Sequence, residues 1–358
     1  MMSTKSFRHL KRLPLYIFWQ TTIRPTLPRN ISHHAIQVSL YSTPSHATKD
    51  RSSALRFRVP ANRNSFEHVR FTAADAPPLS FWEAYTQPPL VPPDSVTPSA
   101  CHEACRKYVS LSLEDGANWR SRCPSLFTLH YVAVILINSS GNKDLAMHVL
   151  HTGVTQGYAP TVLTTARLAL KAGKLGRPQF EIAKEALERL SYPVSSNANR
   201  GNHYRPDALT LSGLAASSMN TPKDTDRALK LFSEAAASFA SSPGSSWQWR
   251  ASAVLEHSKI LLRQKRPDLA RAVLGAQVRD LDNAEACHAY AMLLPPSDPE
   301  RLALLERAAI SGVEAAAREL ARVELERAAE PRLSKREQRD RRIIADEWLR
   351  IAGDEAVA

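Results

Sequence analysis

Cysteines and histidines, the side chains that most often bind zinc, gather between positions 101 and 130 of this 358-residue chain. The group comprises Cys101, His102, Cys105, Cys123 and His130. Structural zinc sites usually combine two knuckles of C-x2-4-C type, and here only the first half is loosely present, because Cys101 and Cys105 lie one helical turn apart. We therefore expect reduced cysteines that pack in a core, with a zinc site and a disulfide involving Cys123 as the alternatives.

A second pair of candidate ligands lies further along the chain. His148 and His151 are three residues apart, so both rings could reach one ion from one helix face. Without a third ligand or the glutamate of an H-E-x-x-H arrangement, polar or helix-capping histidines are the expected role. The remaining cysteine, Cys287, lies in the Ala-rich segment AEACHAYAML, where we expect a core residue.

Motifs of nucleotide-binding and acyl-transfer enzymes are missing from the sequence. Glycine is scarce, with 12 residues against 24 prolines, which disfavours glycine-rich phosphate loops. The chain has no G-x-S-x-G elbow, no Walker loop and no dinucleotide fingerprint. No residue is a candidate for catalysis, so the sequence predicts a non-enzymatic protein with no cofactor.

The formal net charge of +12 is concentrated in two segments. Residues 1–49 hold seven basic side chains and no acidic one, and residues 331–342 carry +4. The rest of the chain is close to neutral at +1. The net charge therefore does not by itself predict a protein that binds polyanions along its whole length.

The acid-free segment 1–49 is rich in Ser, Thr and Arg, a composition typical of a mitochondrial presequence. The string SLYSTPSHA at 39–47 resembles the junction at the end of fungal presequences, which implies processing near Tyr41 and a mature chain that starts near Ser42. A secretory core at 13–23 is disfavoured, because polar residues interrupt it and arginines follow it. A disordered tail is the alternative.

Residues 50–99 form a proline-rich segment with eight prolines, which remove amide donors and deny the preceding residue helical geometry. No long helix is expected here. Aromatic residues occur between the prolines, and LSFWEAY at 79–85 predicts a short helix packed against the region that begins at residue 100. We expect an extended arm laid on the body of the protein, with complete disorder as the alternative.

From 100 to 330, apolar residues recur three and four positions apart, which predicts an all-α fold. Five similar segments recur in this range: DLAMHVL, FEIAKEAL, DRALKLF, DLARAVL and ERLALLE. Their alanines are Ala146, Ala183, Ala228, Ala270 and Ala303, separated by 37, 45, 42 and 33 residues. An Ala-rich helical stretch follows each, and small residues let two helices approach closely. The pattern predicts an α-solenoid of about five to six helix-turn-helix repeats.

The spacing of Ala228, Phe232 and Ala235 resembles the A-x3-F-x2-A signature of the second helix of a tetratricopeptide repeat. LSGLAASS at 211–218 and a long loop accompany it, which is similar to the Sel-one-like variant, as is AAISGVEAAARELA at 308–321. The resemblance covers roughly 125–330. It implies a superhelix without catalytic residues, whose concave face binds peptides or proteins.

One segment, GYAPTVLTTARLALKAGKLG at 157–176, resembles the junction of a pentatricopeptide repeat, the RNA-reading relative. An array that reads bases would need several such units and usually a basic inner face. The near-neutral charge outside the two basic segments disfavours that interpretation.

The C-terminal segment 331–358 is basic and then amphipathic, and we expect it to cap the solenoid as a helix. Ile344, Trp348 and Ile351 share one helix face and predict docking by the later half, while the basic first half projects. The residues proposed to contact RNA, anionic lipid or an acidic partner are Arg336, Arg339, Arg341 and Arg342. A merely solvated basic face is the alternative.

These features together predict a mitochondrial scaffold or adaptor, in the matrix or on the matrix face of the inner membrane. It would bind a protein partner on the concave solenoid face during assembly, translation or quality control. The alternative is an RNA-associated mitochondrial factor that uses the basic C-terminal block. No run approaches the roughly 18 consecutive apolar residues of a membrane span, so no transmembrane segment is predicted.

Overall fold

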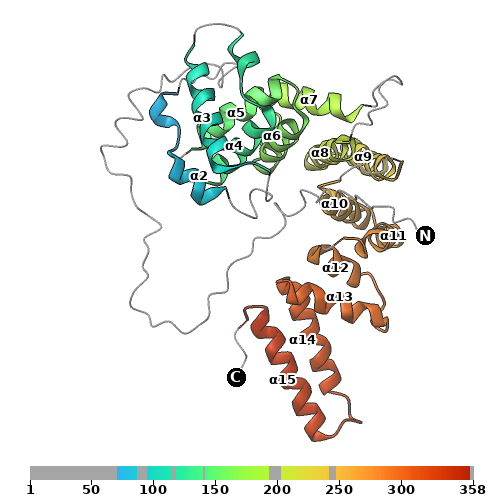
Figure 1. The fold of residues 1–358 in the computed structure, drawn as a ribbon. Helices are drawn as coiled ribbons and strands as arrows, with labels where there is room; N and C mark the ends of the chain where they lie inside the picture. The colour runs from blue at the N-terminus through green and yellow to red at the C-terminus, as the bar shows by residue number, and fades with distance from the viewer. Residues whose placement is uncertain are drawn as a thin grey trace, which may run out of the picture. The chain divides into compact units, whose positions relative to one another are not determined.

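The computed structural model describes residues 71–86, 95–114, 118–139, 142–192, 203–241, 247–281 and 283–354, and its regular secondary structure there is helical (Figure 1). No strand occurs in these ranges, so the all-α prediction is confirmed for them. The predicted presequence, and the predicted arm up to residue 70, lie outside the described residues.

The α-helices are α2 (Leu79–Tyr85), α3 (Pro98–Ser112), α4 (Leu126–Asn138), α5 (Lys143–Thr155), α6 (Ala159–Lys171), α7 (Glu181–Ser191), α8 (Arg205–Ser218), α9 (Pro222–Ser241), α10 (Arg250–Arg263), α11 (Pro267–Val278), α12 (Ala284–Ala291), α13 (Pro299–Ile310), α14 (Glu314–Ala328) and α15 (Lys335–Ile351). Three short 3-10 helices span Ala73–Asp75, Trp119–Arg122 and Pro178–Phe180. The chain divides into two compact units, the first ending at Leu190 and the second beginning at Ser191. This division lies inside the range 100–330 that the sequence assigned to one array.

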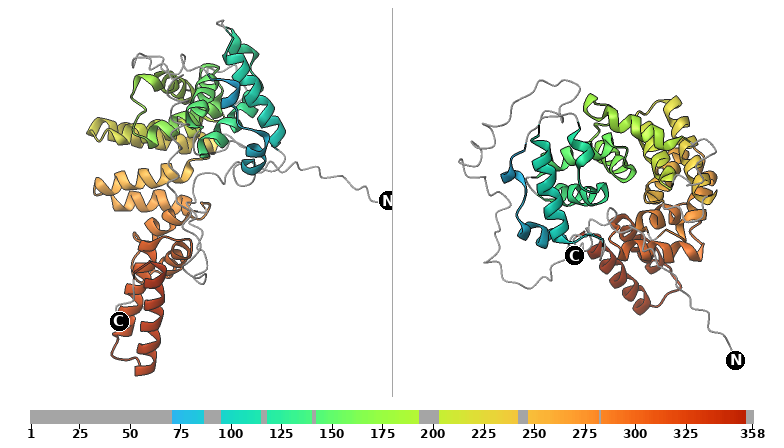
Figure 2. Two further views of the ribbon diagram at one scale, coloured as in Figure 1. Left: turned by 90° about the vertical axis from the view of Figure 1, so that its left-hand side faces the viewer. Right: turned by 45° about the horizontal axis from the view of Figure 1, so that its top comes forward.

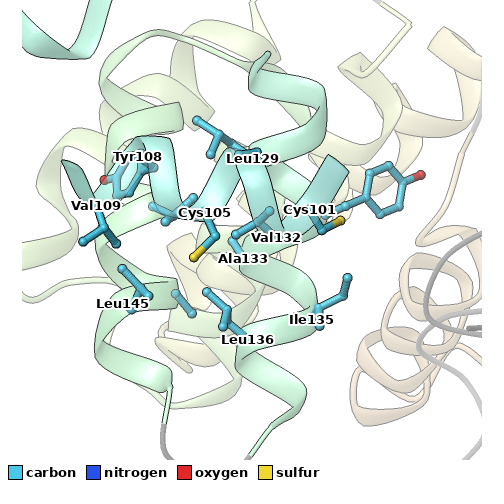
Figure 3. Packing of buried hydrophobic residues seen from close by; sticks show 14 of the residues in the cluster. Cys101, Cys105, Tyr108, Val109, Leu129, Val132, Ala133, Ile135, Leu136 and Leu145 are labelled. Carbon is cyan, nitrogen blue, oxygen red and sulfur yellow. The ribbon is translucent and has the colours of Figure 1, made fainter. Parts of the chain in front are cut away.

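The core of the first unit lies among α3, α4 and α5 (Figure 3). Helix α4 is apolar on nearly all sides, and its side chains Val132, Ile135 and Leu136 are fully buried. The short helix predicted from LSFWEAY is present as α2. Its Trp82 is fully buried in this core, and the indole Nε1 donates to the carbonyl of Pro77 at 3.1 Å. The aromatic side chains therefore do attach this short helix to the body of the unit.

In the second unit, consecutive helices form antiparallel hairpins, most closely α8 with α9, α10 with α11, α12 with α13 and α14 with α15 (Figures 1 and 2). Each repeated segment of α9, α11 and α13 thus pairs more closely with the helix before it than with the one after it. The turns after α8 and α10 each contain one residue with positive φ, Asn220 at 55° and Lys265 at 59°. A left-handed residue of this kind ends a helix and reverses the chain, which makes both hairpins tight.

Small residues lie where the hairpin helices cross, as the alanine pattern predicted. Ala228 is fully buried in one cluster with Phe232 and Ala235. Gly213 of α8 lies against the Phe232 ring so closely that an added Cβ would come within 2.6 Å of it. The absence of a side chain at Gly213 therefore makes room for the Phe232 ring between α8 and α9.

The fifth repeated segment was aligned wrongly. Ala146, Ala183, Ala228 and Ala270 are buried, but Ala303 of α13 is exposed, and Leu304 and Leu305 are buried instead. The buried face of α13 begins at Arg301, whose guanidinium is neutralised by Glu319 of α14. A charged residue therefore occupies a buried position of α13. The alignment of ERLALLE with the other segments placed the buried face of α13 at Ala303, one residue before Leu304.

Candidate functional site

The cysteines of the first unit are core residues. Cys101 and Cys105 are fully buried among apolar side chains of α3 and α4 (Figure 3). Burial raises the pKa of the Cys101 thiol to about 11 and that of Cys105 to about 12, so both stay protonated at neutral pH. All four cysteines are free thiols, and the described ranges hold no group of three or more His, Cys, Asp or Glu placed to bind a metal ion. The packing role predicted for Cys101, Cys105 and Cys287 is confirmed by their burial.

His148 is a buried member of a hydrogen-bonded network. The hydroxyl of Tyr108 lies 2.7 Å from Nδ1 of His148 and 2.7 Å from Oγ1 of Thr152. The ring of Trp119 stacks on the imidazole at a centroid distance of 6.0 Å, and Phe71 contacts it edge-on at 5.2 Å. Burial, with a smaller contribution from Arg120, lowers the pKa of His148 to about 4, so the ring is neutral near pH 7. Of the two expected roles, polar or helix-capping, His148 has the polar one, because its ring takes part in a hydrogen bond from within α5 while aromatic side chains enclose it.

His151, the second member of that pair, lies beside a small cavity. Met147, Thr165, Phe180 and Ala183 line the cavity with it, and its volume is about 10 Å³. Such a space has room for about one water molecule. The two histidines therefore have different neighbours. The cavity beside His151 has no room for a ligand larger than a water molecule.

Helix α10 of the second unit carries a row of polar side chains on one face. Ser252, Glu256, Lys259 and Arg263 recur four, three and four residues apart, and we name these four residues the α10 stripe. Glu256 accepts a hydrogen bond from Ser217 of α8 at 2.6 Å, and the Arg263 guanidinium lies 3.5 Å from the same carboxylate. Lys259 is exposed beside them. The stripe thus contacts the neighbouring hairpin through Glu256, while Lys259 reaches solvent.

A second polar contact joins helices of the last two hairpins. Glu319 of α14 forms ion pairs with Arg301 of α13 and with Arg322 of its own helix, the latter at 2.6 Å. Hydrogen bonds from Arg322 keep the pKa of Glu319 low. Burial lowers the pKa of His288 of α12, and the negative charge of Glu319 partly opposes this shift. Glu319 thus interacts with charged or titratable groups on α12 and α13 from its place on α14.

The structure separates the four arginines that the sequence grouped as partner contacts. Arg336, Arg339 and Arg342 are exposed on α15 and make no ion pair with any described residue. Arg341 is half-buried, and it donates to Glu324 of α14 at 2.8 Å. Arg341 is therefore already engaged by an ion pair inside the hairpin, unlike the other three, and the role of all four as partner contacts stays a prediction.

The predicted apolar face of α15 is displaced by one residue. Ile344 and Ile351 are exposed, while Ala345 and Ala352 are buried, and Trp348 is partly buried against the core of the second unit. Both halves of α15 contact α14, since Arg341 bonds Glu324 in the first half and Arg318 bonds the carbonyl of Ala352 at the end. The prediction of a docking half and a projecting half is thus wrong. One face of α15 packs on α14 along the length of the helix, and the opposite face is exposed.

One buried acidic residue was not singled out from the sequence. Asp207, in the first turn of α8, accepts the backbone N–H of Trp249 at 2.9 Å, and Thr210 accepts the indole N–H of Trp247 at 2.8 Å. Burial raises the pKa of Asp207 to about 7, although backbone hydrogen bonds from Trp249 and Gln248 oppose the rise. The sequence feature that could have indicated its burial is its position next to ALTLSGLAAS, a run of the same helix without charged or aromatic residues.

No helix within the described ranges has the length and apolar character needed to cross a membrane. Comparison with protein-family models, with curated proteins and with solved structures finds no match to this chain. The function is therefore inferred from the surfaces described above.

Proposed function

We propose that this chain is a non-enzymatic mitochondrial scaffold, a Sel-one-like tetratricopeptide solenoid that holds a protein partner. The observation that supports it most is the order of helix contacts in the second unit. Helix α10 contacts α8 two places before it and α12 two places after it, as well as its immediate neighbours α9 and α11. Contacts between every second helix are what stacked hairpins produce, because the first helices of successive repeats lie side by side.

On this proposal, the first helices of the hairpins line the concave face, and the α10 stripe is part of the partner surface. Solenoids of this class bind extended partners along that face. Lys259 is exposed there, and Glu256 and Arg263 present a paired acid and base beside it. A mixed polar surface of this kind suits the recognition of a polar peptide segment better than the enclosure of a small molecule. The mitochondrial location rests on the composition of residues 1–49.

Site-specific photo-crosslinking in isolated mitochondria tests the proposal. A photoreactive residue replaces Lys259 of the α10 stripe, and a matched variant carries it at Lys230 of α9, whose side chain is 78% exposed. We expect a discrete protein adduct at position 259 that survives nuclease treatment, and none at position 230. Equal adducts at both positions, or an adduct removed by nuclease, would contradict a partner surface on α10.

The second candidate is an RNA-associated mitochondrial factor. It is favoured by one observation, the three exposed arginines of α15 that have no ion-pair partner in the described residues. Nuclease-sensitive crosslinks that map to α15 and not to α10 would support this candidate over the scaffold.

A further inference from the structure

Helix α15 carries two classes of basic side chain. Arg341 and Arg350 form ion pairs with Glu324 and Glu347. Four others are exposed and have no ion-pair partner among the described residues, and we name them the α15 basic face: Lys335, Arg336, Arg339 and Arg342. Glu337 and Asp340 are the acidic residues that lie between these four, so residues 335–342 keep an excess of positive charge, while Asp346 and Glu347 follow later in the helix.

The four basic residues of this face do not stabilise the helix that carries them. Lys335 and Arg336 lie in the first turn of α15, where the helix dipole disfavours positive charge. Arg339 is three residues from Arg336 and three from Arg342, spacings at which like charges repel each other. Glu337 partly offsets this by closing a capping box with Ser334, whose hydroxyl and backbone N–H donate to it at 2.7 and 2.8 Å. A local arrangement that costs helix stability is expected where a function requires it.

An isoleucine lies within the basic face. Ile343 is 51% exposed, and it follows Arg339 by four residues and Arg336 by seven, so the three side chains share one side of the helix. Ala352 is nine residues further along, which at about 100° per residue puts it on the opposite side, and Ala352 is buried against the core. Ile343 therefore projects from the outermost line of α15. Arg336, Arg339 and Arg342 lie on its N-terminal side, and Asp340, Asp346 and Glu347 are its acidic neighbours three or four residues away.

An anionic lipid surface fits this combination better than RNA does. Arginines and lysines are attracted to negatively charged headgroups, and an aliphatic side chain among them gains by entering the boundary between headgroups and acyl chains. Proteins that bind single-stranded RNA supply aromatic platforms on which bases stack. The aromatic side chain of α15, Trp348, packs partly buried against the core of its own unit.

We propose that the α15 basic face and Ile343 bind reversibly to the surface of a bilayer that contains anionic phospholipid. The contact is peripheral, since it uses the solvent side of a helix whose other side stays packed on α14. Glu337 and Asp340 reduce the attraction, so binding depends steeply on headgroup charge and on salt. The contact does not involve the α10 stripe and is independent of the scaffold proposal.

Vesicle flotation of the full chain tests this contact. Vesicles of phosphatidylcholine alone are compared with vesicles that also contain phosphatidylglycerol, across a range of salt concentrations. Residues 1–49 carry +7 in every variant, so the measured quantity is the difference between variants. The test variant replaces Arg336, Arg339 and Arg342 with Gln. The control replaces Lys223, Arg227 and Lys230 of α9 with Gln, which removes the same charge from exposed positions.

We expect the α15 triple variant to bind anionic vesicles at least several-fold more weakly than the α9 control, with the difference shrinking as salt rises. Ile343→Ser, which changes no charge, should also weaken binding, while circular dichroism and melting stay as in the wild type. Equal loss in both triple variants would overturn the proposal, as would wild-type binding by Ile343→Ser. A further overturning outcome is that the arginines affect binding of a single-stranded RNA oligonucleotide but not of vesicles.

Discussion

Arg341 of α15 donates a hydrogen bond to Glu324 of α14 at 2.8 Å, and this pair joins the two helices of the last hairpin. Glu324 is buried and also accepts from Arg327 at 2.9 Å, so its carboxylate is held by two arginines. The pair explains why one member of the basic block is structural while its neighbours in sequence are free.

We expect Arg341→Gln to destabilise the protein by about 1 kcal/mol. The value is modest because the Arg341 side chain is 40% exposed and Glu324 keeps Arg327. Arg342→Gln, one residue further along, removes the same charge from an exposed position and should leave the free energy of unfolding unchanged. Denaturant unfolding of both variants measures the difference, and equal effects would show that the Arg341–Glu324 pair does not contribute.

Asp207 should make the second unit less stable as pH rises. Its folded pKa of about 7 lies above the unfolded value of 3.8, so its stabilisation is complete below pH 3.8 and is lost as pH rises through about 7. Asp207→Asn removes this titration, so the ratio of the stabilities measured at about pH 5 and about pH 8 should fall toward one. Denaturant unfolding at the two pH values gives that ratio. A variant with the same pH dependence as the wild type would exclude Asp207 as the titrating group.

The first unit should show the opposite dependence. The folded pKa values of His130 and His148 are both about 4, below the unfolded value of 6.5, because burial disfavours the charged ring. The contribution of these two histidines to the free energy of unfolding is therefore fully present above pH 6.5 and is lost as pH falls through about 4. Amide hydrogen exchange in α3 to α6 should accelerate over this range. In a His130→Gln, His148→Gln double variant the acceleration should be smaller, and an unchanged pH profile would count against this origin.

Ala228→Arg should destabilise the protein by several kcal/mol, since a charge would enter a fully buried helix crossing that offers no partner. Ala303→Arg is the matched control, because the sequence pattern aligned Ala303 with Ala228 but the structure exposes it. The control should melt within a degree or two of the wild type, as surface substitutions usually do. Thermal melting followed by circular dichroism compares the two, and similar melting temperatures would contradict the assigned faces of α9 and α13.

Trp348→Ala should cost about 2 kcal/mol, less than the usual 3 to 5 kcal/mol for a large aromatic residue in a core. The reduction follows from the partial burial of Trp348 against the core of the second unit. Ile344→Ala, on the face predicted to dock, should cost little, because Ile344 is exposed. If Ile344→Ala proves the more destabilising change in denaturant unfolding, the assigned orientation of α15 is wrong.

Local pattern was sufficient for the helices themselves. Apolar residues three and four apart determine an α-helix wherever they recur, because one face must leave water. LSFWEAY and the Ala228, Phe232, Ala235 spacing were interpretable for that reason, and both proved to be helical and attached through buried side chains. The composition of residues 1–49 supports only a prediction of targeting, and the described residues do not test it.

Tertiary structure decided which of two adjacent residues enters the core. In α13 the choice was between Ala303 and Leu304, and in α15 between Ile344 and Ala345, where the smaller side chain is the buried one. Periodicity locates a face only to within about one residue, since adjacent positions differ by about 100° around the helix. Which of two adjacent residues is buried depends on how closely the partner helix approaches, and that distance is set by residues far away in the sequence. The same reason applies to Asp207, His148 and Arg341, whose partners Trp249, Tyr108 and Glu324 lie 42, 40 and 17 residues away.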